Sequence, residues 1–393
     1  MDFLENKTLK HVLISICMLI LLIFFVQMFH KASRPGGYDF TCFFLAAKAI
    51  AVGQSPYDIN SVFNYIYPAF LSVCLIPLTF LPYTLANIVW FLFSTFCFFY
   101  GVRIILKRER NNTNNYIIVV SVAFLVFLNI IQNNLLNGQV NMIVLLLCLL
   151  FFDNYIDGSK IISVLFLALA ISIKLVPGVF ILYLLVRREW KMLFFAVLFC
   201  TCFIVLLPLV FLGQKLIPIY SSYFSFLLTS TASIETPIKD ICFNLSNILA
   251  WFVPALLRAP LILKVIAVVF LCFVALYDYK YVTLQKNDRV QGFYLYLCLI
   301  LLLSPISETH HLIYLLPGTI LLINRVASQR TLFSTEFLYL IVFIVLVILG
   351  KIFRVSPFYF FAIILLLWYH FRNMNRKLHV IGNRAIPGLI NEK

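Results

Sequence analysis

The chain consists largely of long apolar runs, and its few charged side chains lie mainly at the ends of these runs. Of its 393 residues, 63% are hydrophobic and 11% are charged. A membrane-crossing helix needs about 20 apolar residues, and in lipid the backbone must satisfy its own hydrogen bonds. The runs are continuous, whereas the strands of a membrane barrel alternate apolar and polar residues. The sequence therefore predicts an all-α membrane protein.

Apolar runs and stop signals predict about 12 transmembrane helices in one multi-spanning domain, residues 1–393. The segments that would alternate onto one side hold 20 of the 30 Lys and Arg residues. Basic loops favour the cytoplasm, so we expect both termini there. The expected spans are roughly 11–30, 83–106, 116–131, 138–152, 161–173, 176–186, 192–213, 260–279, 290–304, 311–324, 337–353 and 357–371.

The first outward segment, roughly residues 31–82, is long and half-apolar, and Gly and Pro interrupt it. We expect its amphipathic stretches to form interfacial helices on the membrane surface. The net charge of +15 is explained by basic loops on an anionic lipid leaflet rather than by nucleic acid. The ten cysteines form no CxxC and no metal-type spacing, which favours free thiols.

In this orientation five ionisable side chains fall on the outer face, and such groups at membrane depth are retained mainly for chemistry or substrate binding. Asp39, in RPGGYDF, can act as a general base for a hydroxyl nucleophile. Taken alone, an exposed loop aspartate is the simpler interpretation, but the apolar residues that follow would partly bury it. The five residues are Asp39, Lys174, Glu308, His310 and His311.

Lys174 comes just before Pro177, which interrupts the apolar run. A cation at such a break favours an anion such as a phosphate. His310 and His311 can also donate to phosphate oxygens. Adjacent histidines lack the spacing of a zinc site, and an interfacial polar turn is the structural alternative. We expect a phosphate-binding group of Lys174, His310 and His311, without metal or cofactor.

The amides Asn137, Gln139 and Asn141 in NLLNGQVN suit the recognition of hydroxyl groups such as those of sugars, although a capping cluster explains them equally well. The sequence has no Walker A, GxGxxG or Ser-His-Asp signature. The two aspartates of DNYID at 153–157 would lie inside the cell, but they are not the acidic pair of a nucleotide-sugar enzyme. A cytoplasmic nucleotide donor is therefore disfavoured.

Five segments, in order, resemble glycosyltransferase family 87, the polyprenol-phosphate-mannose-dependent mannosyltransferases of the GT-C superfamily. They are YDF-x5-AAKAIAVGQSPYD at 38–58, YPAF with IPLTFLP at 67–82, NGQVN at 137–141, SIKLVPGVFILYLLVRREWK at 172–191 and SPISETHH at 304–311. Members often have Tyr-Pro-Pro at 67–69 and Trp at 309, where this chain has Tyr-Pro-Ala and Thr. The resemblance implies a GT-C-type helical bundle.

The resemblance also implies a hexosyltransferase that moves a hexose, expected to be mannose, from a polyprenyl-phosphate sugar to a glycan or glycolipid on the outer face. The expected membrane is the bacterial inner (plasma) membrane. The family's general base corresponds to Asp39, its Lys-x-x-Pro element to Lys174, and its double histidine to His310 and His311. A single displacement would invert the anomeric carbon. Side chains expected to bind sugar or acceptor are Tyr38, Asn137, Gln139, Asn141 and Glu308.

Two other classes of function use similar apolar chains. A lipid-glycan flippase or transporter is expected to show inverted repeats and polar residues near the bilayer midplane, and the sequence shows neither. A glycan ligase or polymerase would share the external site, so this alternative stays open.

Overall fold

The computed structural model describes residues 7–32, 38–108, 116–232, 242–284, 290–304, 307–328 and 334–385, and the regular elements of these residues are all helical. The α-helices are α1 (Lys7–Ala32), α2 (Asp39–Ala51), α3 (Ala69–Leu75), α4 (Tyr83–Arg108), α5 (Tyr116–Val126), α6 (Leu128–Asn137), α7 (Asn141–Ile156), α8 (Lys160–Ile173), α9 (Val179–Val186), α10 (Trp190–Thr201), α11 (Leu207–Leu212), α12 (Leu216–Ala232), α13 (Leu245–Phe252), α14 (Pro260–Leu284), α15 (Val290–Leu303), α16 (Leu316–Ser328), α17 (Thr335–Phe353) and α18 (Ser356–Ala385). The 3-10 turns are η2 (Ile76–Phe80), η4 (Val176–Gly178), η6 (Gly213–Lys215), η7 (Pro254–Arg258) and η8 (Thr309–Leu315), and η5 (Cys202–Leu206) is a π-helical turn. The all-α prediction is confirmed for these residues.

Five of the described helical segments are long and apolar enough to cross a membrane. They are α1, α4, the run Trp190–Ser225, the stretch Leu261–Tyr281 of α14, and α17. Shorter apolar helices include α7 and α8. The chain is thus a multi-pass integral membrane protein. The total of about 12 spans, and the interfacial position of α2 and α3, stay predictions.

The segment expected to form one span at 116–131 is divided instead. Helix α5 ends at Val126, and α6 leaves it at an angle of 69°. The polar residues Gln132, Asn133 and Asn134 make α6 a poor continuation of an apolar span, because amides in lipid need partners. The Gln132 amide donates to the side-chain oxygen of Gln27 at 2.9 Å, and the Asn134 amide donates to the carbonyl of His310, in the site described below.

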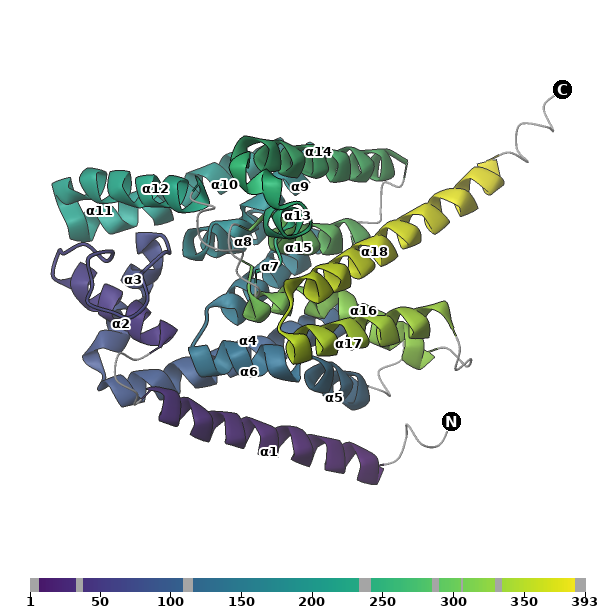
Figure 1. The fold of residues 1–393 in the computed structure, drawn as a ribbon, viewed down its shortest axis with the longest axis horizontal. Helices are drawn as coiled ribbons and strands as arrows, with labels where there is room; N and C mark the ends of the chain where they lie inside the picture. Colours follow the sequence, from purple (N-terminus) through teal and green to yellow (C-terminus); the bar gives the residue numbers. More distant parts are fainter. Residues whose placement is uncertain are drawn as a thin grey trace.

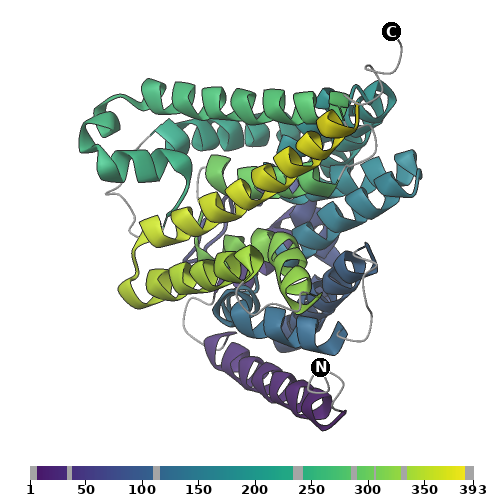
Figure 2. The same cartoon turned by 90° about the vertical axis from the view of Figure 1, so that its right-hand side faces the viewer.

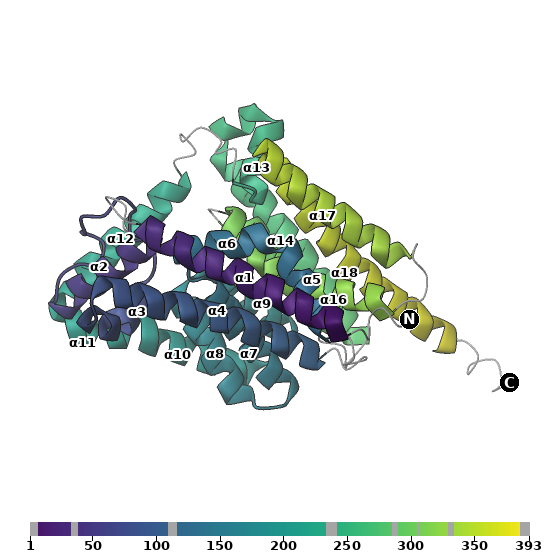
Figure 3. The same cartoon turned by 90° about the horizontal axis from the view of Figure 1, so that it is seen from below.

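Two groups of helices enclose the centre of the molecule. In one group α4 packs on α7, α7 on α8, and α8 on α10. In the other, α18 packs on α15 and on α17, and Figure 2 shows α18 in yellow beside α17. The turn η8 contacts α6, α7 and α15 and so lies between the groups. Helix α1 runs along α5 and α6 at the edge of the bundle (Figure 3).

The first described helix begins, and the last one ends, at the same end of the molecule. In Figure 1 the start of α1 and the end of α18 lie to the right, whereas α2, α3 and α12 gather at the left. An even number of crossings between the two ends of the chain agrees with this arrangement. Helices α2 and α3 of the predicted first outward segment therefore lie at the end opposite the start of α1 and the end of α18.

In the run from α10 to α12, the π-helical turn η5 comes just before Pro208. Pro208 has no N–H to donate to the carbonyl of Ile204, and the hydroxyl of Tyr220 donates to this carbonyl instead. On the next turn of α12, Tyr223 stacks on Tyr57 with ring centroids 4.8 Å apart. These contacts hold α12 against the loop that follows α2.

Candidate active site

The start of α2 positions Asp39. Tyr38 is the N-cap residue in extended conformation, and its backbone N–H donates to the Thr41 hydroxyl at 3.0 Å. The Tyr38 side chain is buried, and its hydroxyl donates to the side-chain oxygen of Asn87 on α4. Asp39 is therefore held at the first position of α2. This packing favours a positioning role for Tyr38, and its expected contact with sugar stays a prediction.

The carboxylate of Asp39 is half-buried and accepts a hydrogen bond from the Gln139 side-chain amide at 2.6 Å. The hydroxyl of Tyr67 donates to the other end of that amide at 3.3 Å. Burial raises the pKa of Asp39, and it outweighs the hydrogen bond from Gln139 and the charge of Lys31, which act in the opposite direction. A carboxylate with a raised pKa is suited to accepting a proton.

A glycine brings Gln139 to this carboxylate. Helix α6 ends at Asn137, and its C-cap Gly138 has a φ of +63°; the Trp90 indole donates to the Gly138 carbonyl at 2.8 Å. A Cβ at this position would lie 2.6 Å from the Cβ of Phe40 and 3.0 Å from the ring of Tyr38. Glycine is needed here both for the backbone conformation and for the close approach of α2.

Lys174 lies at the break between α8 and α9, as the sequence predicts. It is the C-cap of α8 in extended conformation, and the turn η4 with Pro177 follows it. Its Nζ donates to the Asn141 side-chain oxygen at 2.8 Å and lies 2.6 Å from Nε2 of His311. The Tyr67 ring centroid is 5.9 Å from Nζ. Tyr67 therefore lies between Lys174 and the Gln139–Asp39 pair.

The segment that begins at Ser307 completes the site. The Glu308 backbone N–H donates to Nδ1 of His311 at 2.9 Å, and the rings of His310 and His311 have centroids 4.2 Å apart. The Glu308 carboxylate lies 3.8 Å from Nδ1 of His310. The Asn134 amide of α6 donates to the His310 carbonyl at 2.8 Å. The polar face of α6 thus fixes the double histidine.

The structure brings together the five ionisable residues that the sequence predicts on one face. Asp39, Lys174 and Glu308 are close enough for their charges to influence one another. Gln139 and Asn141 bridge these groups, whereas Asn137 lies beside them and accepts from the Lys31 ammonium. The chemical roles of these residues stay predictions.

Three contributors were not predicted from the sequence, namely Tyr67, Asn134 and Lys31. Tyr67 lies in the YPAF segment, whose sequence alone gives no chemical role for the tyrosine. Asn134 lies in the polar stretch between the spans expected at 116–131 and 138–152, where an exposed loop residue is the ordinary interpretation. Lys31 follows an apolar run, which is also the ordinary place for an interfacial lysine.

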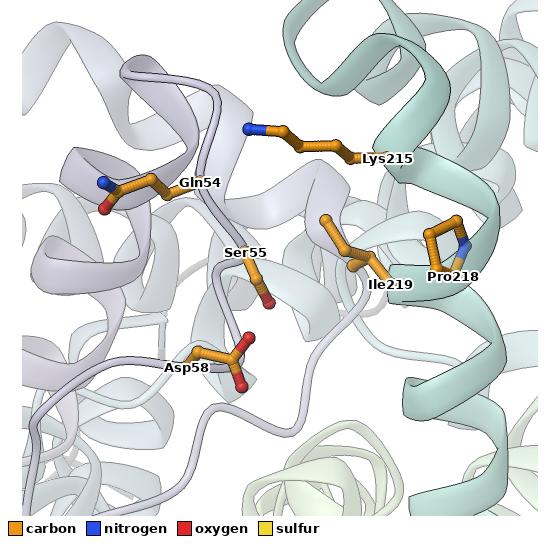
Figure 4. A pocket seen from close by; sticks show the side chains of 6 residues that line it. All are labelled: Gln54, Ser55, Asp58, Lys215, Pro218 and Ile219. Carbon is orange, nitrogen blue, oxygen red and sulfur yellow. The ribbon is translucent and has the colours of Figure 1, made fainter.

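A separate hollow of about 410 Å³ lies between the loop after α2 and the start of α12 (Figure 4). It is lined by Gln54, Ser55, Asp58, Lys215, Pro218 and Ile219, none of which belongs to the Asp39 site. The described part of the chain contains no group of three or more His, Cys, Asp or Glu side chains suited to a metal ion. None of the ten cysteines, all in described segments, forms a disulfide.

The chain matches the family model of glycosyltransferase family 87 over residues 65–305, which is more than half of its length. The matched segment contains Gln139 and Lys174, whereas Asp39 precedes it and the double histidine follows it. No curated protein matches the chain. The resemblance noted in the sequence is confirmed, and the chain belongs to glycosyltransferase family 87 and is a membrane glycosyltransferase.

Proposed function

We propose that this glycosyltransferase transfers a hexose, with mannose as the first candidate, from a polyprenyl-phosphate sugar to a glycan or glycolipid acceptor. The observation that carries the proposal is the connected arrangement of Asp39, Gln139, Tyr67 and Lys174. In this arrangement the half-buried carboxylate of Asp39 and the half-buried amine of Lys174 are separated by the phenol of Tyr67 and the amide of Gln139. A displacement at a glycosyl phosphate needs these two groups, one for the attacking hydroxyl and one for the departing phosphate.

In the proposed reaction the acceptor hydroxyl attacks the anomeric carbon while the bond from this carbon to the phosphate oxygen breaks. Asp39 takes the hydroxyl proton. Lys174, His310 and His311 stabilise the charge that develops on the phosphate. One displacement inverts the anomeric carbon, and no sugar becomes attached to the protein.

The remaining polar groups of the site suit the recognition of a sugar. Gln139 and Asn141 have side-chain amides that can donate to and accept from hydroxyls. Glu308 has a side chain 30% exposed, so its carboxylate is accessible to a ligand. We propose that these three residues orient the donor sugar or the acceptor.

We also propose that the site faces outward from a bacterial inner (plasma) membrane, with both termini in the cytoplasm. The support is the position of α2 and α3 at the end opposite the start of α1 and the end of α18 (Figure 1). The basic bias of the predicted inner segments gives the same orientation.

The test uses membranes that contain the protein, a polyprenyl-phosphate hexose labelled in the sugar, and no nucleotide sugar. We expect transfer of label to an endogenous or added glycolipid, greatest for the mannosyl donor, and little transfer with the Lys174→Ala variant at equal protein level. Transfer that requires a nucleotide sugar, in membranes unable to make the lipid-linked form, would refute the proposed donor.

A further inference from the structure

Both ring nitrogens of His311 are engaged, and together these contacts fix where its proton lies. The backbone N–H of Glu308 points at Nδ1, at 2.9 Å. A backbone N–H can only donate, so Nδ1 accepts and carries no proton. A neutral imidazole then has its proton on Nε2. Rotating the ring by half a turn would replace both nitrogens with carbons and lose both contacts.

The proton on Nε2 determines the state of Lys174, whose Nζ lies 2.6 Å away. An ammonium group has three donors and no lone pair, so it cannot accept from Nε2–H. A neutral amine can accept this proton and still donate to the Asn141 oxygen, which lies 2.8 Å from Nζ. An ammonium at this position would instead need both nitrogens of His311 to accept, which a neutral imidazole cannot do.

We infer that His311 holds Lys174 as a neutral amine, and that binding of a phosphodiester brings one proton to Lys174. This inference rests on the proposed function, since it concerns the phosphate group of the donor. A phosphate oxygen near Nζ stabilises an ammonium by charge. Once Lys174 donates to the phosphate, the Nε2–H of His311 is released and can donate to the phosphate as well.

The other charged and titratable groups around Lys174 do not make an ammonium at Lys174 compatible with the Nε2–H of His311. The carboxylates of Asp39 and Glu308 favour a charged Lys174, and His310 lies beside His311. Tyr67 presents its ring and Tyr314 places its hydroxyl 3.5 Å from the Asn141 oxygen. None of these contacts supplies the lone pair that the Nε2–H of His311 requires.

The proton has a use in the transfer. The donor diester carries one negative charge, and cleavage of its bond to the sugar leaves a phosphate monoester with two. The acceptor proton goes to Asp39. The ammonium of Lys174 can give its proton to the monoester, which then leaves with one negative charge. Lys174 is again an amine and regains its hydrogen bond from His311.

The test is calorimetric titration of the full-length protein in detergent with farnesyl methyl phosphate, a phosphodiester whose own charge is constant near neutral pH. Binding heats are compared in HEPES and Tris buffers, which differ in ionisation enthalpy and contain no phosphate to compete for the site, so their difference counts the protons taken up. We expect an uptake close to one proton. In Lys174→Arg we expect binding with almost no uptake, because guanidinium stays charged.

The variants Asp39→Asn and Glu308→Gln test whether a carboxylate takes up the proton in place of Lys174. Both variants should retain the uptake. Binding without uptake by the unaltered protein would overturn the inference and leave the proposed donor intact. Uptake that persists in Lys174→Arg, or that is lost in Glu308→Gln, would also overturn it. No binding of the diester at all would contradict both this inference and the proposed donor.

Discussion

Replacing Gly138 with alanine tests how the structure positions Asp39. The added Cβ would lie 2.6 Å from the Cβ of Phe40, and both atoms belong to positions fixed by the backbone. A left-handed conformation costs an L-residue roughly 1–2 kcal/mol, and overpacking costs about 1–3 kcal/mol. The two effects together predict a loss of about 2–5 kcal/mol in the free energy of unfolding. This loss is measurable by unfolding in mixed detergent micelles.

Gly158 is the matched control. It also has a positive φ, +85°, but an added Cβ would meet no atom within 4 Å. Gly158→Ala should therefore show only the backbone cost, roughly 1–2 kcal/mol.

The activity of the two variants should differ as well. Because Tyr38 and Phe40 flank Asp39, their displacement moves the carboxylate, and a shift near 1 Å can cost about 100-fold in rate. Gly158→Ala should keep normal turnover per folded molecule. Equal losses of stability and activity in Gly138→Ala and Gly158→Ala would refute the role assigned to the close approach of α2.

Three further predictions follow from other parts of the molecule. Turnover should fall as pH decreases through the raised pKa of Asp39, because the carboxylate is the active form. In Gln139→Leu this acid limb of the pH–rate profile should move to higher pH, since the variant loses a hydrogen bond that favours the charged carboxylate. An acid limb that does not move would contradict the role of Gln139 as the partner of Asp39. Asp278 and Arg187 form a buried ion pair with side chains 0% and 3% exposed, so Asp278→Ala should lower the free energy of unfolding by about 3–5 kcal/mol, and a loss near zero would contradict this. A reporter fused after Lys393 should be active only in the cytoplasm, and activity only outside would reverse the proposed orientation.

Much of the site could be predicted because its ionisable side chains are rare in a chain that is otherwise largely apolar. Asp39, Lys174 and the residues 308–311 are polar groups at the ends of apolar runs, and threading these runs through a bilayer is enough to place them on one face. The break at Lys174 was also predictable, because Pro177 lies inside an apolar run and a proline in a helix interior has no N–H for the helical hydrogen bond.

The contacts that assemble the site were not predictable from local pattern. Tyr67 reaches Gln139 and Asn134 reaches the His310 carbonyl across 72 and 176 residues of chain. Such pairings depend on how the helices pack, and the local pattern of a sequence does not show this packing. The bend between α5 and α6 could not be predicted either, because no proline or glycine lies at Phe127; beyond the bend α6 packs on η8, a long-range contact.

The most direct test of the central proposal is to remove the basicity of Asp39 while keeping its shape. General-base catalysis contributes about 100- to 10,000-fold, so Asp39→Asn should lose turnover on this scale and still bind the lipid-phosphate donor. Asp58→Asn is the control, because Asp58 belongs to the same outward segment but lines the separate hollow shown in Figure 4. Both variants are purified at matched folded yield and compared in one transfer assay. We predict a nearly inactive Asp39→Asn beside a nearly normal Asp58→Asn; near-normal turnover by Asp39→Asn, or loss of activity in Asp58→Asn instead, would contradict the assignment of the base.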